Sequence, residues 1–210
     1  MYTHSKQLIT AGIPIDQAKK ALIMLHGRGA TAQGIIGLTN HFNLAATTII
    51  APQATEHSWY PYSFMAPVED NEPALGSALA LIDNVVTDIV SKGIAKSHIY
   101  FLGFSQGACL TLEYVTRNAN EYGGAVAFTG GLIGQKLAIE NYKGDFKHTP
   151  VLITTGDHDI HVPLTRVEES VAIIKGMNAN VRLNVYKGRP HTITTHELDL
   201  AVQHVFQNKI

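Results

Sequence analysis

The sequence predicts an α/β fold in which a mostly parallel, doubly wound sheet is flanked by helices. Short apolar runs alternate with longer segments of helical periodicity along most of the chain. Most of these runs are apolar throughout rather than alternating, which is typical of strands covered on both faces of a parallel sheet. Strands that alternate with helices form right-handed βαβ units. Functional residues are then expected at the carboxyl ends of the strands.

Six apolar runs are predicted to be strands, and the segment Ser5–Thr10 is a further candidate for an edge strand. Each run is five or six residues long and is followed by a stretch rich in glycine, proline or polar residues. The six runs are Ala21–Leu25, Thr47–Ala51, His98–Gly103, Gly124–Thr129, Pro150–Thr155 and Val181–Tyr186.

Two segments show a clear apolar stripe at helical spacing. In Glu72–Lys92 the stripe repeats every three or four residues, with Pro73 in the first turn and Gly93 just after the end. A similar stripe predicts a helix near the C-terminus. The stripe residues are Leu75, Leu79, Ile82, Val86 and Ile89 in the first segment, and Leu198, Ala201, Val202 and Val205 in the second.

Length and composition predict one α/β domain over residues 1–210. The chain is 45% hydrophobic and 16% charged, so it can bury a core, and its formal net charge of −1 gives no reason to expect binding to nucleic acid. We expect no stable membrane insertion, because no apolar run approaches the ~20 residues that a spanning helix needs. Cys109 is the single cysteine and the N-terminus lacks a signal-peptide pattern, which favours a cytoplasmic location.

The motif GFSQG (103–107) places Ser105 where an apolar strand ends and a helix begins. In this context the serine occupies a sharp turn, and the small flanking residues let the helix and the neighbouring strands approach closely. The hydroxyl then lies at the N-terminus of a helix, where free N–H groups favour developing negative charge. The alternative is an ordinary tight turn. The strand–turn–helix context favours a nucleophilic serine.

A nucleophilic serine needs a base, and the base needs an orienting acid. In this arrangement the acid and then the histidine follow the serine along the chain. Asp157 and Asp159 follow the strand that ends at Thr155, and His191 lies in the loop after the last strand. These candidates therefore reach the same edge of the sheet, although the spacing alone leaves both aspartates open.

An oxyanion hole is the remaining requirement for acyl transfer. The first predicted strand runs into LHGRGA (25–30), whose glycines allow backbone N–H groups to face a cavity. The second donor is expected to be the backbone N–H of Gln106, the residue after the nucleophile.

The segments LHGRGA, GFSQGA, GDHDIHVP and GRPHTI together resemble the phospholipase/carboxylesterase family of small α/β-hydrolases, which includes bacterial carboxylesterases and acyl-protein thioesterases. This resemblance implies an α/β-hydrolase fold without a large cap domain. It also implies Ser105 as nucleophile, His191 as base, Asp159 as the acid, and the backbone N–H groups of Arg28 and Gln106 as oxyanion donors. No metal or other cofactor is implied.

Two departures from the family pattern bear on the substrate. Thioesterase-like members usually carry an apolar residue where this chain has Arg28, and a Ser-Gly element where it reads TGGLIG (129–134). Both departures count against a long-chain lipid or acyl-protein substrate. The side chain of Arg28 is hypothesised to favour polar or anionic substrates.

Two segments are candidates for the wall of a substrate pocket. Pro52–Pro67 contains several aromatic rings, which either contact an apolar substrate, with Trp59 as the candidate residue, or pack the loop onto the domain. The excursion Gly130–Thr149, with Leu132 as its candidate, either shapes the acyl side of the pocket or packs on the surface. Eleven histidines include the pair in HDIH (158–161), but that segment reads as a loop, so no metal site is expected.

These observations predict a serine carboxylesterase with a Ser-His-Asp triad and an acyl-enzyme intermediate. The alternatives are an acyl thioesterase or lysophospholipase and, from a different class, a non-catalytic small-molecule-binding relative that kept the fold. The expected partner is a small-molecule ester or thioester, and a homodimer is left open.

Overall fold

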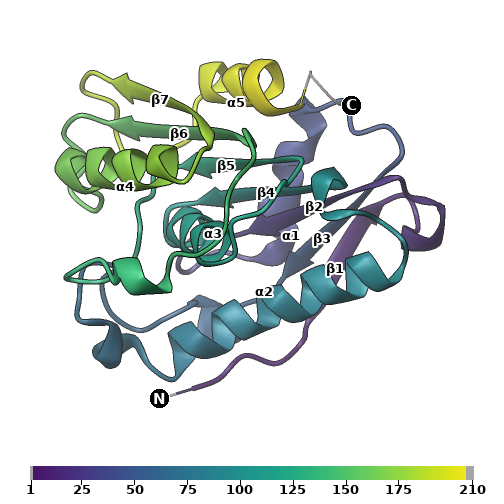
Figure 1. The fold of residues 1–210 in the computed structure, drawn as a ribbon, viewed down its shortest axis with the longest axis horizontal. Coiled ribbons are helices and arrows are strands. Elements are labelled where there is room, and N and C mark those ends of the chain that lie inside the picture. The colour runs from purple at the N-terminus through teal and green to yellow at the C-terminus, as the bar shows by residue number, and fades with distance from the viewer. Residues whose placement is uncertain (1, 207–210) are drawn as a thin grey trace.

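The computed structural model describes residues 2–206, and its centre is a seven-stranded sheet in the order β1-β3-β2-β4-β5-β6-β7 (Figure 1). Strand β1 pairs antiparallel with β3, and all other neighbours are parallel. The strands are β1 Leu8–Gly12, β2 Lys20–Leu25, β3 Thr47–Pro52, β4 Ile99–Phe104, β5 Gly124–Phe128, β6 Pro150–Gly156 and β7 Asn180–Tyr186. The predicted α/β architecture is therefore confirmed.

The six apolar runs all form strands, whereas the edge strand differs from the predicted one. It spans Leu8–Gly12 rather than Ser5–Thr10, with Leu8 opposite Pro52 and Gly12 opposite Thr48. The start is later because Gln7 N donates to Ser5 O at 2.8 Å in a local turn. Gly12 ends the strand with a φ of 73°, a conformation that glycine adopts without strain.

Four α-helices lie between strands: α1 Ala32–Ile36, α2 Ala74–Ser91, α3 Gln106–Arg117 and α4 Leu164–Gly176. Helix α5, Thr195–Ala201, follows β7 and continues as a π-helical turn over Val202–Phe206. The predicted stripe of α2 is buried except at Leu79, which is only partly covered. Short 3₁₀ turns occur at Ile15–Gln17, Gly37–His41, Thr55–His57, Val68–Asn71, Lys96–His98 and Ile139–Asn141.

Helix α2 is long and apolar enough to cross a membrane by length and composition, with a mean hydropathy of 1.4 over 18 residues. This property differs from the expectation that no apolar segment approaches the length of a spanning helix. In the structure, eight of its residues are buried, among them Leu75, Ile82 and Ile89 in the main core cluster. Its apolar face is thus occupied by the sheet and by α3, as in the core helix of a packed domain.

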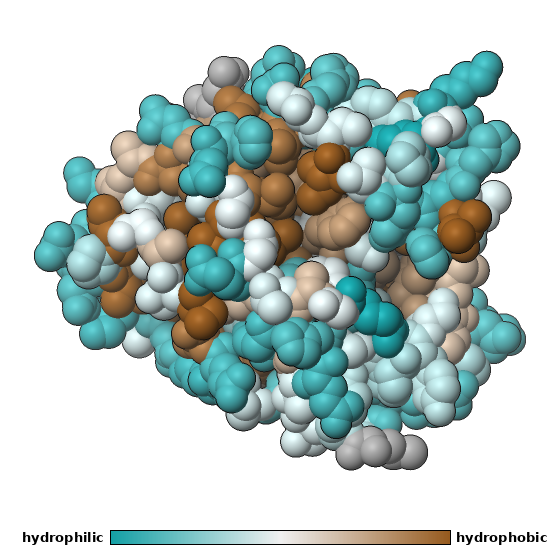
Figure 2. Space-filling model, turned by 180° about the vertical axis from the view of Figure 1, so that it is seen from behind, coloured by the Kyte–Doolittle hydropathy of each residue, from teal (hydrophilic) through white to brown (hydrophobic). Residues whose placement is uncertain are grey.

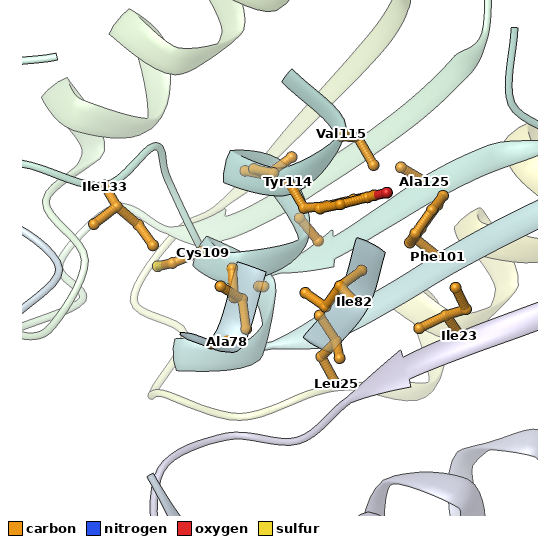
Figure 3. Packing of buried hydrophobic residues seen from close by; sticks show 14 of the residues in the cluster. Ile23, Leu25, Ala78, Ile82, Phe101, Cys109, Tyr114, Val115, Ala125 and Ile133 are labelled. Atoms are coloured by element: carbon orange, nitrogen blue, oxygen red, sulfur yellow. The ribbon is translucent and has the colours of Figure 1, made fainter. Parts of the chain in front are cut away.

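One face of the sheet is covered by α2, α3 and α4, and this layer contains the larger core cluster (Figure 1). Figure 3 shows Ile82 of α2 and Tyr114 of α3 directed toward Ile23 of β2 and Phe101 of β4. These residues are almost completely buried, and each such large side chain stabilises the fold by about 1.5–3 kcal/mol relative to an exposed position.

The other face of the sheet is covered more thinly by α1, α5 and the C-terminal π-helical turn. Buried residues of these elements include Ile35, Leu198 and Phe206, which pack against Leu22 and Leu102 of the sheet. Seen from behind, this side of the molecule shows a broad apolar area bordered by hydrophilic residues (Figure 2). Both faces of the central strands are therefore apolar, which explains why their sequences do not alternate.

All the parallel strands end at one edge of the sheet, on the left in Figure 1, where the loops after β2, β3, β4, β5, β6 and β7 lie. Between β5 and β6, residues 129–149 contain a single 3₁₀ turn, and no helical cap is inserted between strands in the described chain. The site formed by these loops is consequently open to one side.

Candidate active site

Ser105 lies in a sharp turn between β4 and α3. Its backbone has φ 55° and ψ −119°, outside the regions that residues with a side chain normally occupy. The turn is fixed on both sides, because Ser105 N donates to Phe128 O at 3.0 Å and Cys109 N donates to Ser105 O at 3.0 Å. The strand end and the first turn of α3 together hold this serine at the carboxyl edge of the sheet.

The two glycines of the GFSQG motif are required by close backbone approach. A Cβ on Gly107 would lie 2.1 Å from Leu25 O at the end of β2, and a Cβ on Gly103 would lie 2.2 Å from Gly107 O. Both contacts are with backbone atoms, which cannot rotate away as a side chain can. The glycines therefore allow α3 to start directly against β2, as the sequence motif predicted.

Substitution of Gly107 by alanine is expected to lower the free energy of unfolding by about 2–3 kcal/mol, because the added methyl overlaps the end of β2. Urea denaturation measures this effect. Gly176→Ala is the matched control, since a Cβ there has no heavy atom within 4 Å, and it should not destabilise the protein. Equal unfolding midpoints for the two variants would contradict this packing argument.

Ser105, His191 and Asp159 form a continuous hydrogen-bonded chain. The distance from Ser105 Oγ to His191 Nε2 is 2.8 Å, and that from His191 Nδ1 to Asp159 Oδ2 is 2.7 Å. An ionised carboxylate can only accept, so Nδ1 carries the proton and Nε2 is free to accept from the serine hydroxyl. The three residues predicted from separate loops are thus brought together in a geometry suited to general-base activation of the serine.

The Asp159 carboxylate is fully buried, yet it is held in its ionised form. Burial opposes ionisation, but hydrogen bonds from the His191 ring and from the N–H groups of His161 and Val162 outweigh burial, and they hold the pKa of Asp159 below its usual value. One carboxylate oxygen is used by the two N–H groups and the other by His191. The acid is therefore both charged and fixed in orientation.

Asp157, the other acidic candidate, has a different position. Its Oδ1 accepts from Gly188 N at 2.7 Å, and its Oδ2 lies 3.8 Å from His158 Nε2 at the surface. Asp157 therefore ties the loop after β6 to the loop after β7, whereas Asp159 contacts the imidazole.

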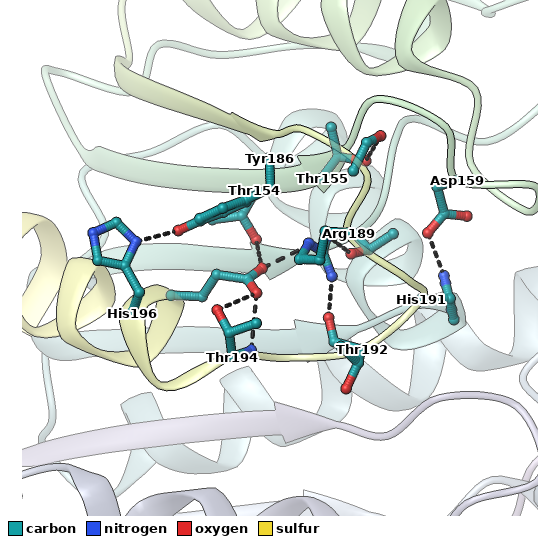
Figure 4. A network of polar contacts seen from close by, with 12 residues as sticks. Thr154, Thr155, Asp159, Tyr186, Arg189, His191, Thr192, Thr194 and His196 are labelled. Atoms are coloured by element: carbon teal, nitrogen blue, oxygen red, sulfur yellow. Dashed lines mark hydrogen bonds and ion pairs between the residues drawn. The ribbon is translucent and has the colours of Figure 1, made fainter.

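The loop that carries His191 is held by a buried polar network (Figure 4). Arg189 donates to Thr129 Oγ1 at 2.7 Å and to Thr192 O, and its guanidinium lies 3.7 Å from the buried carboxylate of Glu197. Glu197 also accepts from Thr154 Oγ1 and from the backbone and hydroxyl of Thr194, which caps α5. A buried charge pair of this kind depends on the hydrogen bonds that satisfy its remaining polar atoms, and here only Arg189 Nε among the described atoms of the pair is buried without a partner. No motif in the sequence predicted this network.

The loop after β2 lies against Ser105. A Cβ placed on Gly27 would be 3.5 Å from Ser105 Cβ, and Gly29 N donates to His57 O at 2.7 Å. Among the hydrogen bonds of residues 2–206, none uses the backbone N–H of Arg28 or of Gln106. Both N–H groups are therefore free to donate to a ligand.

The buried ring of His26 joins the loop after β2 to the loop after β3. Its Nε2 accepts from Ala54 N at 3.1 Å, so Nδ1 is the nitrogen that donates to Gly27 O at 2.8 Å. Burial lowers the pKa of His26 and keeps the ring neutral. His26 therefore has a structural role in the loop after β2.

The side chain of Arg28 binds the aromatic loop after β3. Its Nη1 donates to Ser58 Oγ at 2.9 Å and to Pro61 O at 2.8 Å, and its Nη2 donates to Tyr62 O at 2.6 Å. The guanidinium carbon lies 6.0 Å from the centre of the Tyr60 ring, within the range of a cation–π contact. Arg28 thus connects the loop after β2 to the aromatic segment.

The serine opens into a cleft of about 600 Å³, a volume suited to a small-molecule ligand. Its lining includes all three types of group needed at such a site: the nucleophile, the imidazole, and apolar or aromatic walls. The lining residues are Arg28, Tyr60, Pro61, Tyr62, Ser63, Phe64, Ser105, Gln106, Cys109, His161, Val162 and His191.

Neither of the predicted pocket residues lines this cleft. Trp59 is fully buried, where its Nε1 donates to His26 O at 2.8 Å and its backbone N donates to Gln106 Oε1 at 2.9 Å. The ring therefore packs the aromatic loop onto the domain, which was the alternative interpretation. Its neighbour Tyr60 faces the cleft instead.

Leu132 is likewise a core residue rather than a pocket residue. Its backbone N donates to Ser170 Oγ at 2.9 Å, and Arg166 donates to the carbonyls of Leu132, Gly134 and Gln135. These bonds fold the segment after β5 against α4. The apolar side chain is consequently buried in the main cluster and does not contact the cleft.

His161 is the cleft residue that the sequence analysis missed as a functional candidate. Its ring lies edge-on to His191, with centroids 4.9 Å apart, and its backbone N binds Asp159. The sequence feature that could have identified His161 is its position two residues after Asp159 in the same loop.

Within residues 2–206, no group of three or more histidine, cysteine or acidic side chains is arranged to hold a metal ion.

Comparison with known proteins places this chain in a family. Residues 9–208 match the family model described as Phospholipase/Carboxylesterase. A crystal structure of a phospholipase/carboxylesterase from Dyadobacter fermentans is 63% identical, covers 98% of both chains and has a TM-score of 0.96. The acyl-protein thioesterase 1 of Gibberella zeae is 28% identical over 207 residues, covering 88% of each chain.

A plant relative is similar over a shorter region. The probable carboxylesterase SOBER1-like of Arabidopsis thaliana is 26% identical over 128 residues, which is 61% of this chain and 49% of that protein. The chain therefore matches about half the length of this relative, whereas its match to the bacterial structure is nearly complete. From the family match over residues 9–208 and the α/β-hydrolase sheet, we conclude that this chain belongs to the phospholipase/carboxylesterase family.

Proposed function

We propose that the protein is a serine carboxylesterase that hydrolyses small carboxylic esters through an acyl-enzyme. The observation that carries this proposal is the hydrogen-bonded chain from Ser105 through His191 to Asp159, located at a strained turn that opens into a cleft. Membership of the family supports the reaction class.

In the first half-reaction, His191 Nε2 takes the proton of Ser105 as Oγ attacks the ester carbonyl carbon. The carbonyl oxygen becomes negatively charged and accepts from the backbone N–H groups of Arg28 and Gln106. The imidazolium is stabilised by Asp159, whose lowered pKa keeps it ionised. When the tetrahedral intermediate collapses, the C–O bond to the alcohol breaks and His191 returns the proton to the leaving oxygen.

The second half-reaction repeats this chemistry with water. His191 removes a proton from water as the water oxygen attacks the acyl carbon, and the same two N–H groups bind the oxyanion. Breakage of the bond to Ser105 Oγ releases the acid, and the serine recovers its proton from His191. All the proton transfers are made by one ring nitrogen, which is why its single orientation matters.

Thioester hydrolysis is a second candidate, since a relative that covers 88% of the chain is named an acyl-protein thioesterase. The same residues would cleave a C–S bond. Lysophospholipase activity is a related alternative. The choice of oxygen esters rests on the polar side chains of Arg28, Ser63 and His161 in the lining of the cleft.

An activity panel tests the proposal on the unmodified protein. Oxygen esters, acyl thioesters and lysophospholipids of matched acyl length are compared by kcat/KM, and a fluorophosphonate probe reports whether a reactive serine is present. We expect labelling at Ser105 and the highest kcat/KM for short oxygen esters. Absence of both labelling and turnover would favour the non-catalytic binding alternative, and a higher kcat/KM for thioesters would favour the thioesterase.

A cytoplasmic location and a single domain over residues 1–210 also belong to this proposal. The only cysteine, Cys109, is a buried free thiol in the cleft, which suits a reducing compartment.

A further inference from the structure

The wall of the cleft carries a positive charge that no carboxylate in the described chain neutralises. Arg28 forms its hydrogen bonds with one hydroxyl and two carbonyl oxygens, none of which is charged. By contrast, Arg117, Arg166 and Arg189 each lie beside a glutamate. The Arg28 guanidinium therefore keeps its full charge at the cleft.

The other groups that line the cleft do not offset this charge. Arg28, Tyr60–Phe64, Ser105, Gln106, Cys109, His161, Val162 and His191 include no aspartate or glutamate. The nearest acid in the site, Asp159, is fully buried behind His191 and uses both of its oxygens there. The net formal charge of the lining is thus positive even with neutral histidines.

Arg28 also has donor capacity that its structural bonds do not use. A guanidinium has five N–H groups, of which the contacts with Ser58, Pro61 and Tyr62 use three. The side chain is exposed rather than buried, so the remaining N–H groups can be reached from solvent. Its three bonds and the Tyr60 ring hold it in one orientation, which reduces the entropy lost when it binds an anion.

The backbone of Arg28 fixes where an anion would lie relative to the reaction. Its N–H is a proposed oxyanion donor, so the guanidinium is one arginine side chain away from the carbonyl under attack. We propose that the cleft selects esters that carry a carboxylate or phosphate a few bonds from the ester carbonyl, with Arg28 as the residue that recognises the anion. This inference rests on the proposed ester hydrolysis and adds the substrate class.

Matched ester pairs test the proposal, because they share the reacting bond and differ in charge. The acyl-side pair is p-nitrophenyl hydrogen glutarate and p-nitrophenyl pentanoate, whose acyl chains have equal carbon number. The alcohol-side pair is 4-acetoxybenzoate and its methyl ester. For at least one pair, the ratio of kcat/KM for the anionic to the neutral ester should fall about tenfold in Arg28→Gln. The pair that responds identifies the side of the ester that carries the anion.

Arg182→Gln is the matched control, because Arg182 is an exposed arginine on the edge strand β7 and does not line the cleft. Its ratios should equal those of the wild type. Should Arg28→Gln fail to fold, the wild-type ratio is measured between about 20 mM and 500 mM NaCl, where screening of an exposed cation should lower it severalfold.

Unchanged ratios for both pairs in folded Arg28→Gln, or a salt-independent ratio where that variant does not fold, would overturn the inference. Turnover of neutral esters by the wild type would then still support the proposed hydrolase. Absence of turnover on all four esters would instead count against the proposed function itself, so the two failures are distinguishable.

Discussion

Replacement of Ser105 by alanine is expected to lower kcat for a short p-nitrophenyl ester by about 10⁴-fold or more. The hydroxyl is the nucleophile of the proposed acyl-enzyme, and its Oγ lies 2.8 Å from His191 Nε2. Alanine keeps the Cβ and adds no bulk, so the turn between β4 and α3 should persist. The measurement is steady-state hydrolysis at neutral pH, together with loss of fluorophosphonate labelling.

His191→Ala provides the companion measurement and a test of additivity. Because the serine and the histidine act as one unit, the double variant should lose little more activity than either single variant. Far-ultraviolet circular dichroism and thermal unfolding establish that both variants fold. A folded Ser105→Ala protein that retains more than about one tenth of the wild-type kcat would remove Ser105 from the role of nucleophile.

Substitution of Asp159 by asparagine should lower kcat by about 10³–10⁴-fold with a small change in KM. An amide offers a donor as well as an acceptor, so it stabilises the imidazolium poorly and can stabilise the wrong tautomer of His191. Asp157→Asn is the matched control, since the amide oxygen of asparagine can still accept from Gly188 N. Its kcat should stay within about threefold of the wild type. The reverse pattern would assign the acid to Asp157.

The same variant gives a stability prediction with a defined pH window. The pKa of Asp159 is lower in the folded protein than its unfolded value of about 3.9, so the ionised carboxylate stabilises the fold at pH values above this. That contribution is lost as the pH falls through the folded pKa. The difference in free energy of unfolding between wild type and Asp159→Asn should therefore be largest near neutrality and shrink below about pH 4.

The sheet was predictable because its central strands are buried on both faces and are apolar throughout. The position of Ser105 was predictable for a related reason. A Cβ on either flanking glycine would lie only 2.1 or 2.2 Å from a backbone oxygen, so glycine is required at both positions. Such a local requirement can be recognised in the sequence. The order of the serine, aspartate and histidine along the chain then followed from the topology of parallel strands.

The walls of the cleft were less predictable, because they depend on which way a loop side chain turns. Trp59 and Tyr60 are adjacent aromatic residues in one loop and both are buried, yet only Tyr60 contributes to the wall of the cleft, whereas Trp59 packs against His26. The direction is set by Gln106, whose side chain bonds the backbone of both residues. A contact between residues 46 positions apart produces no periodic pattern in the sequence. The ion pair between Arg189 and Glu197, behind the loop that carries His191, likewise produces no such pattern.

Because Arg28 holds the aromatic segment through three hydrogen bonds, the width of the cleft and the position of its own backbone are mechanically coupled. A bulky acyl group that displaced Tyr60 or Tyr62 would also displace Arg28, whose backbone N–H is one of the two proposed oxyanion donors. An ester with a large acyl group would therefore have a lower kcat as well as a higher KM. Discrimination against large acyl groups would then act on the chemical step, through the hydrogen bonds that join these two loops.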